Sequence, residues 1–426
     1  MFHQINVREA DMHVQRFLWC DKDDALDKPS VYVMRALTFG ISCAPFIAHY
    51  VRNKNADNFV PQHPRAVDAI KNHHYVDDFI DSEDSEQVAL DLAEAVKAIH
   101  ASEGFYIRNW ASNSALVLAR LEKRVTGGQA PVQLGASEKV LVCEVEARRN
   151  TSNLSPTKRE VLQVLMSIFD PLGFLSHFTI ALKILLQEIW RLRIDWDEEL
   201  PDDLYSKWRQ WKTTVSQMLS IEIPRCYSLN LNKATDVQLH TFVDAGEYGY
   251  AAVSYLRVQL GNDVDLSLIA AKSKVAPLSP VSIPRLELQS VITGVRLASK
   301  TEVIPRLPIK RKVFWTDSST VLKWLTMDPR QFRQFVMYRV AEILENTNLQ
   351  QWRWVPSRLN PADLATKQES KVDSDTWING PYFLKADEND WLSRKDFGPI
   401  DDSVEIRHHA LHIQIPKQQL VMNKAS

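Results

Sequence analysis

The stretch KVFWTDSSTVLKWL, residues 312–325, joins a strand pattern to a helix start. Its apolar run Val313–Trp315 is typical of a buried strand, and Asp317 ends that run. The hydroxyl side chains of residues 318–320 can begin a helix, because Ser and Thr cap helix N-termini. We therefore predict a strand over 312–318 that leads directly into a helix, with an acidic residue at the end of the strand.

The sequence on both sides continues this alternation. Strand patterns precede it at 239–245, 250–258 and 264–273, followed by a helical pattern at 283–303. After it come a helix at 330–346, a strand at 350–356 and a short helix at 361–367. This order predicts an α/β fold with a mixed sheet flanked by helices, inside a chain whose other parts are α+β and helical.

Four acidic residues occupy comparable positions in this region. Asp244 ends the first strand, Asp317 ends the fourth, Glu287 lies in the helix at 283–303, and Asp363 lies in the last short helix. If the first and fourth strands are parallel neighbours, their acids emerge together at one sheet edge, where the sites of such sheets gather. Clustered carboxylates repel one another unless cations neutralise them, and Mg²⁺ prefers oxygen ligands.

Each acid also has an ordinary structural explanation. Asp317 could cap the helix that follows it, and Glu287 could pair with Arg285 or Lys300 on the surface. The functional interpretation depends on the four acids occurring together at the ends of matching elements.

A second acidic motif occurs in NHHYVDDFIDS, residues 72–82, where Asp77 and Asp78 are adjacent between apolar neighbours. Two buried carboxylates are costly without a cation, whereas an exposed hairpin tip would tolerate them. A helical pattern with Ser85 as its cap follows at 85–100. Further helices are predicted from Ser155–Pro156, with Leu162, Leu165 and Phe169 on one face, from Ser176 to about 193, and at 203–219.

The bulk composition is that of a globular protein. The chain has 426 residues, 45% hydrophobic and 24% charged, with a net charge of -2. That charge argues against a wholly basic nucleic-acid surface but leaves room for a local groove, for which Lys310, Arg311, Lys312 and Trp324 are candidates. The sequence has four separated cysteines, which is typical of a reducing compartment. It has no signal peptide and no apolar run of about 20 residues. We therefore predict an intracellular protein of the cytoplasm or nucleus, with no membrane partner.

Several fragments together resemble a known family. TFVDAGEYGYAAVSYLR, SIPRLELQSVITGVRLA, VFWTDSSTVLKWL and WVPSRLNPADLATK are similar to the ribonuclease H region of Pao/BEL retrotransposon Pol polyproteins. MFHQINVREAD, LTFGISCAPFIA, HHYVDDFIDS and PTKREVLQVLMSIFDPLGFLS resemble the reverse-transcriptase palm and the following connection of the same polyproteins. The resemblance spans roughly residues 1–385.

The resemblance implies four regions. They are the C-terminal part of a truncated reverse-transcriptase palm (1–110), a largely helical thumb or connection (111–235), a ribonuclease H-like domain (236–368), and an acidic tail or linker toward a missing integrase region (369–426). The implied chemistry is hydrolysis of RNA in an RNA–DNA hybrid, with Mg²⁺ or Mn²⁺ held by Asp244, Glu287, Asp317 and Asp363. Partners would be the hybrid or another nucleic acid, and other Pol regions of the same element.

The resemblance also gives the YVDD motif a polymerase role. Asp77 and Asp78 match the carboxylates that bind polymerase metals, Tyr75 and Val76 would support the hairpin, and Phe39–Gly40 would pack against template and nucleotide. The family's third metal aspartate lies just before the MFHQ block, at which this chain begins. The RNA-directed DNA polymerase part is therefore expected to be incomplete.

Two alternatives remain at this stage. An inactive or domesticated remnant could bind nucleic acid without cutting it. An aspartic peptidase is the other alternative, because part of this family has been catalogued as a peptidase. However, Val243-Asp244-Ala245-Gly246 lacks the hydroxyl of the peptidase turn.

Overall fold

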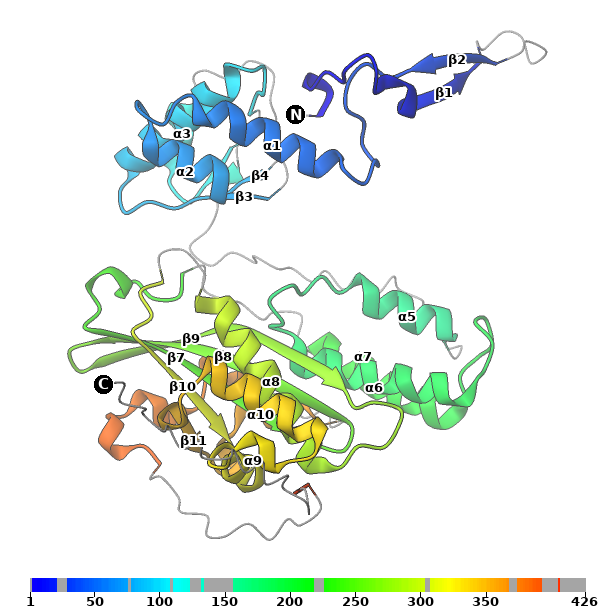
Figure 1. The fold of residues 1–426 in the computed structure, drawn as a ribbon, viewed down its shortest axis with the longest axis vertical. Coiled ribbons are helices and arrows are strands. Elements are labelled where there is room, and N and C mark those ends of the chain that lie inside the picture. The colour runs from blue at the N-terminus through cyan, green and yellow to red at the C-terminus, as the bar shows by residue number, and fades with distance from the viewer. Residues whose placement is uncertain are drawn as a thin grey trace, which may run out of the picture. The chain divides into compact units, whose positions relative to one another are not determined.

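The computed structural model describes residues 2–20, 29–75, 78–107, 110–122, 132–133, 156–217, 226–302, 307–367, 374–392 and 405–406. The chain divides into two compact units, Met1–Ala136 (unit 1) and Ser137–Ser426 (unit 2). Figure 1 shows unit 1 in blue to cyan and unit 2 from green to red. No described helix combines the length and apolar character that a membrane-spanning helix needs.

Unit 1 is mainly helical, with three short strand pairs. Its helices are α1 (Ala44–Asp57), α2 (Pro64–Asn72), α3 (Glu86–Ala101) and α4 (Ala115–Glu122). Antiparallel pairs join β1 (Arg16–Trp19) to β2 (Ser30–Val33) and β3 (His74–Tyr75) to β4 (Asp78–Phe79), and a parallel pair joins β5 (Ala111–Ser112) to β6 (Val132–Gln133).

The helix predicted at 85–100 is confirmed as α3. The Ser85 hydroxyl accepts a hydrogen bond from the Val88 backbone N–H, which satisfies one of the free donors at the helix start. The apolar face of α3 carries Leu92, Val96 and Ile99, which pack against α2. This helix follows directly on the β3–β4 hairpin.

Unit 2 begins with three helices: α5 (Lys158–Ser167), α6 (Ser176–Leu192) and α7 (Asp202–Gln217). The expected cap of α5 needs correction, because Thr157 caps it in a capping box with Glu160. Ser155 lies outside the described residues. Phe169 was expected on the apolar face, but it follows the end of α5 and its side chain is 66% exposed.

The predicted mixed sheet is confirmed in unit 2. Its strands are β7 (Asp236–Ala245), β8 (Gly249–Leu260), β9 (Asp263–Val275), β10 (Arg311–Thr316) and β11 (Trp352–Trp354), in the order β11-β10-β7-β8-β9. β7, β10 and β11 are parallel, and β8 and β9 are antiparallel to their neighbours. The region is therefore α/β, as predicted, with β7 at the centre.

Side chains alternate between the two faces of this sheet. In β10, Phe314 belongs to the core under the helices α8 (Ile283–Glu302), α9 (Ser319–Leu325) and α10 (Gln334–Asn346). Its neighbours Val313 and Trp315 belong to a second core on the other face. The sheet is thus covered on both faces.

The second face is covered partly by residues 374–392. This segment contains α11 (Ser374–Asn379), and its side chains Trp377 and Leu384 are fully buried. The Tyr255 hydroxyl and the Arg257 guanidinium of β8 donate hydrogen bonds to the backbone carbonyls of Trp377 and Leu384 respectively. The expectation of a linker is therefore wrong for residues 374–392, because they form part of the core of unit 2.

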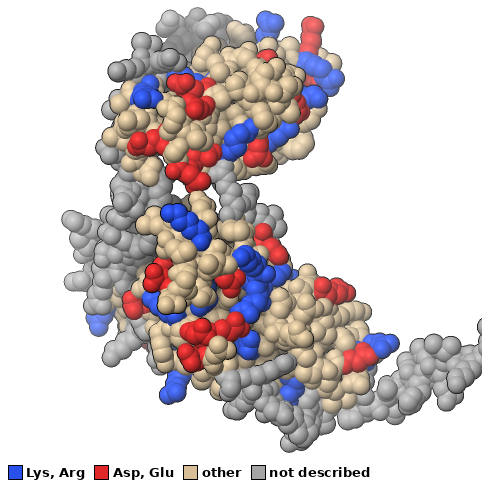
Figure 2. All heavy atoms as spheres, turned by 90° about the vertical axis from the view of Figure 1, so that its left-hand side faces the viewer, with Lys and Arg blue, Asp and Glu red and all other residues tan. Residues whose placement is uncertain are grey.

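Charged side chains are mixed over the face seen in Figure 2, where Lys and Arg alternate with Asp and Glu. Small groups of Lys and Arg lie beside small groups of Asp and Glu, and most of the described surface in this view carries neither. This distribution agrees with the small net charge of -2.

Candidate active site

The strand register brings Asp244 and Asp317 together. β7 and β10 are parallel, and Thr316 pairs with Val243. Asp317 follows Thr316 and Asp244 follows Val243, so the two acids lie side by side at the carboxyl ends of adjacent strands. The sequence pattern predicted this edge of the sheet.

Glu287 reaches the same edge from the first part of α8. A side chain at Gly294 would collide with Val243 of β7, so this glycine lets α8 approach the strand closely. Arg285 does not pair with Glu287. Its guanidinium instead donates two hydrogen bonds to the Glu405 carboxylate, at 2.6 and 3.1 Å.

Asp363 is held beside β7 by the residues before it. It lies in a 3₁₀ turn, Pro361–Ala365, where the sequence predicted a short helix. The Asn360 side-chain amide donates a hydrogen bond of 3.0 Å to the Val243 carbonyl, which fixes this turn against the end of β7. The Lys367 ammonium lies 2.5 Å from the Asp363 carboxylate.

The electrostatics show that the four acids form one cluster. Burial raises the pKa of Asp244 to about 7, and the negative charges of Asp317, Asp363 and Glu287 also raise it. Burial, together with the charge of Asp317, raises the pKa of Glu287 to about 6. The pKa of Asp317 is also raised, again mainly by burial. Perturbed carboxyl groups that interact in this way are typical of functional sites.

Three hydroxyl groups donate hydrogen bonds into this cluster, each at 2.6 Å. Thr366 donates to Asp244, Ser318 to Glu287, and Ser357 to Asp317. The sequence analysis did not identify these residues. Ser318 and Thr366 follow predicted site acids closely in the chain, but no sequence signal marks Ser357.

The donor chemistry of the cluster fits Mg²⁺, which takes carboxylate oxygens as ligands. Within the ranges that the structure describes, however, no group of three or more His, Cys, Asp or Glu side chains is arranged to hold a metal ion. The acids are nevertheless close enough to perturb one another's pKa.

The YVDD motif of unit 1 is only partly described. Val76 and Asp77, and the side chain of Tyr75, lie outside the described residues. The backbone of Tyr75 pairs with that of Asp78, whose side chain is exposed. The metal and polymerase roles of these residues stay predictions.

Phe39 and Gly40, the other two residues assigned to the polymerase, precede α1. The Phe39 side chain is 65% exposed and its ring centroid lies 4.6 Å from that of Phe2. Gly40 has a φ of 88°, which favours glycine. Their contact with template and nucleotide likewise stays a prediction.

The candidate nucleic-acid residues differ in their surroundings. Trp324 lies in α9 and is fully buried in the core between the helices and the sheet, so it is a core residue and not a nucleic-acid contact. The Lys310 ammonium donates a hydrogen bond to the Thr235 carbonyl, Arg311 pairs with Glu388, and Lys312 pairs with Glu302. These three cations therefore have protein partners, and their role in nucleic-acid binding stays a prediction.

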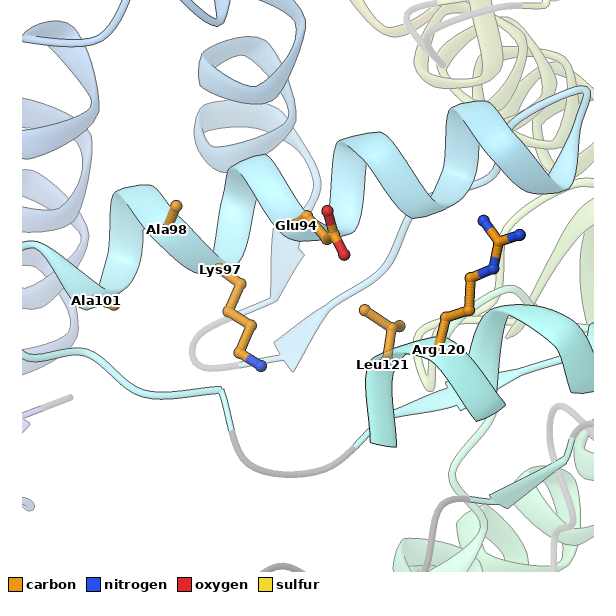
Figure 3. A pocket seen from close by; sticks show the side chains of 6 residues that line it. All are labelled: Glu94, Lys97, Ala98, Ala101, Arg120 and Leu121. Carbon is orange, nitrogen blue, oxygen red and sulfur yellow. The ribbon is translucent and has the colours of Figure 1, made fainter. Parts of the chain in front are cut away.

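A surface hollow of about 250 Å³ lies elsewhere, in unit 1 between α3 and α4. Figure 3 shows Glu94 and Lys97 projecting from α3 toward Arg120 and Leu121 of α4. None of the predicted site residues lines it, so this hollow has no connection with the acidic cluster.

Residues 157–318 match the Pao retrotransposon-like RNaseH-like domain family. Asp244, Glu287 and Asp317 lie inside the matched range, and Asp363 lies beyond it. The range begins at the cap of α5, so the match includes the three helices that precede the sheet. No curated protein matches the chain.

Three solved structures show distant similarity. The first is the N-terminal RNase H domain of a Mycobacterium tuberculosis protein, fused to maltose-binding protein; it is 16% identical, the match covers 31% of this chain and 91% of that chain, and the TM-score is 0.23. The second is RNase H1 from the archaeon Halobacterium salinarum, at 17% identity over 30% of this chain and 90% of that chain, with a TM-score of 0.20. The third is the foamy viral protease-reverse transcriptase in complex with double-stranded DNA, at 13% identity over 82% of this chain and 54% of that chain, with a TM-score of 0.45. This chain thus spans about half of the foamy viral protein. The family match does not depend on these similarities, whose TM-scores are all low.

Proposed function

Because residues 157–318 match the Pao retrotransposon-like RNaseH-like domain family, we propose that unit 2 is a ribonuclease H-type nuclease. The proposed reaction is hydrolysis of the RNA strand in an RNA–DNA hybrid, dependent on Mg²⁺ or Mn²⁺. The observation that carries the proposal is the cluster of four acids at the carboxyl ends of two parallel strands. Burial, together with the charges of the other three acids, raises the pKa of Asp244 to about 7.

Asp244, Glu287, Asp317 and Asp363 would hold the divalent ions. When bound, such ions supply an activated water and stabilise the charge of the leaving oxygen. The protein itself places the carboxylate oxygens of these four acids at one edge of the sheet. Because their mutual repulsion opposes ionisation, cations relieve an unfavourable interaction that is already built into the fold.

The raised pKa of Asp244 makes cation binding depend on pH. At a pKa of about 7, this carboxyl group is half protonated near neutral pH. A cation therefore displaces protons when it binds, and its affinity should rise with pH up to the point where the acids are ionised.

The test is cleavage of an end-labelled RNA–DNA hybrid by the purified chain with and without Mg²⁺. Asp244→Asn removes a proposed ligand at nearly constant volume and should lower the cleavage rate by about 10²- to 10³-fold, judged by single electrostatic contributions to catalysis. Asp328→Asn is the matched control, because Asp328 pairs with Arg330 and lies outside the cluster.

Cleavage by Asp244→Asn at the rate of the unchanged chain would refute the proposal. A chain that binds the hybrid in Mg²⁺ but leaves it uncut would also refute it. That result would favour the alternative, a nucleic-acid-binding protein derived from such a nuclease.

A further inference from the structure

The acids of the cluster share a feature that the proposed metal-ligand role does not by itself require. Three of them accept a hydrogen bond from a hydroxyl on a different element of the fold. Thr366 follows the 3₁₀ turn but serves Asp244 in β7, Ser357 follows β11 but serves Asp317, and Ser318 precedes α9 but serves Glu287 in α8. The hydroxyls thus connect all the elements that carry the four acids.

We propose that Thr366, Ser318 and Ser357 are positioning residues that keep these carboxylates oriented for divalent cations. The inference rests on the proposed nuclease function, since it assigns the cluster to cation binding. Groups of this kind around metal ligands set the orientation of the ligand.

The contact of Thr366 with Asp244 supports the positioning role most strongly. Its side chain and that of Asp244 are 2% and 7% exposed, so water has little access to this contact. The Thr366 oxygen lies 2.6 Å from Oδ2 of Asp244 and 3.0 Å from the Asp363 carbonyl. A hydroxyl has one proton to donate, and the shorter distance and the negative charge favour Asp244 as its acceptor.

Each contact engages a single carboxylate oxygen. Thr366 approaches Oδ2 of Asp244, Ser357 approaches Oδ2 of Asp317, and Ser318 approaches Oε2 of Glu287. A carboxylate has two oxygens, so a hydroxyl on one of them leaves the other to face a cation. Ser318 is itself fixed, because its oxygen accepts a hydrogen bond from the Val321 backbone N–H and so caps α9.

The experiment measures Mn²⁺ affinity of the full chain without nucleic acid, by calorimetry or by the electron paramagnetic resonance of free Mn²⁺. Thr366→Val keeps the shape of the side chain and removes the hydroxyl, and we expect a loss of affinity of about 10- to 100-fold. Thr366→Ser restores the hydroxyl and should bind Mn²⁺ nearly as tightly as the unchanged chain. Thr301→Val is the control, because Thr301 is 3% exposed and donates only to the Leu297 carbonyl.

Equal Mn²⁺ affinity for Thr366→Val and the unchanged chain would overturn the inference. If Thr366→Val does not fold, Ser357→Ala provides the same test, because Ser357 is exposed and its replacement removes no buried volume. An unchanged affinity for Ser357→Ala would then overturn the inference.

A further variant separates the inference from the proposed function. If the unchanged chain binds Mn²⁺, Asp244→Asn does not and Thr366→Val binds normally, only the positioning role is wrong. If Asp244→Asn binds as tightly as the unchanged chain, the proposed metal site fails, and the positioning role fails with it.

Discussion

Acidic residues are close neighbours in two regions of this molecule, for different reasons. In unit 1, Asp77 and Asp78 are neighbours in the sequence, and Asp78, the one that the structure describes, lies in β4 with its side chain exposed. In unit 2, four acids far apart in the sequence converge because two parallel strands end together and a helix and a turn pack beside them. An exposed carboxylate such as that of Asp78 costs the fold little, whereas the buried cluster opposes folding unless cations or hydrogen bonds compensate. Convergence in space is therefore the better indication of function here.

We expect the positions of the acids at the ends of β7 and β10 to depend on packing by residues that are distant in the sequence. Trp377 is fully buried on the sheet face opposite α8, and its indole N–H donates a hydrogen bond of 2.8 Å to the Phe174 carbonyl. Trp377→Ala should lower the stability of unit 2 by about 3–5 kcal/mol, the usual cost of removing a buried aromatic ring. Amide hydrogen exchange would show faster exchange in β7 and β10 and no change in α3.

The control for that variant is Phe46→Ala in α1, because Phe46 is 74% exposed. Its replacement should change stability by less than about 0.5 kcal/mol. If Trp377→Ala leaves exchange in β7 unchanged, the sheet edge that gathers the acids does not depend on the segment that covers it.

The second-largest expected difference between the two acidic regions is in the pH dependence of stability. The folded-state pKa values of Asp244 and Glu287 are raised to about 7 and about 6, so the folded chain holds more protons than the unfolded chain between about pH 4 and pH 7. The stability that these groups contribute is present below pH 4 and is lost as the pH rises through their folded-state values. Asp244→Asn should therefore stabilise unit 2 by about 2–4 kcal/mol at pH 8 in EDTA, and by little at pH 4.

Urea unfolding of both variants, Asp244→Asn and Asp78→Asn, gives the measurement. Asp78→Asn should leave the pH profile unchanged, because the Asp78 side chain is exposed. A destabilised Asp244→Asn protein at pH 8 would show that the acids do not repel one another in the folded state.

The smallest expected effect is stabilisation by the cation itself. A ligand at ten times its dissociation constant stabilises the folded state by about 1.4 kcal/mol, equivalent to about tenfold slower amide exchange. Mg²⁺ should therefore slow exchange in β7 and β10 but not in α3 or the β3–β4 hairpin. Equal protection of both units would mean that Mg²⁺ does not bind preferentially to the buried cluster.

The sequence predicted the sheet well because its periodicity was strong. Strands such as β7 and β10 are apolar runs that end in polar residues, and a 20-residue amphipathic pattern marks α8. Asp244 and Asp317 followed from this pattern, since parallel neighbouring strands fix where their ends lie. The geometry of the strands was therefore sufficient to predict where two of the acids meet.

Other features depend on tertiary contacts that no local pattern reports. Trp377 and Leu384 lie in an acidic segment without regular apolar spacing, so composition indicated a linker although both side chains are buried. Trp324 looked available to nucleic acid because aromatic side chains stack on bases, yet its helix turns it into the core. The hydroxyl of Ser357 meets Asp317 only because β11 lies beside β10.

The position of residues 374–392 in the chain has a consequence for synthesis. All five strands of the sheet precede this segment, so a nascent chain leaves the ribosome with part of one apolar sheet face uncovered until Trp377 and Leu384 emerge. Until then the face can bind chaperones or aggregate with other nascent chains. A messenger that stops translation after Lys367 but before α11 would therefore encode every proposed catalytic acid and still yield a polypeptide with part of its sheet uncovered.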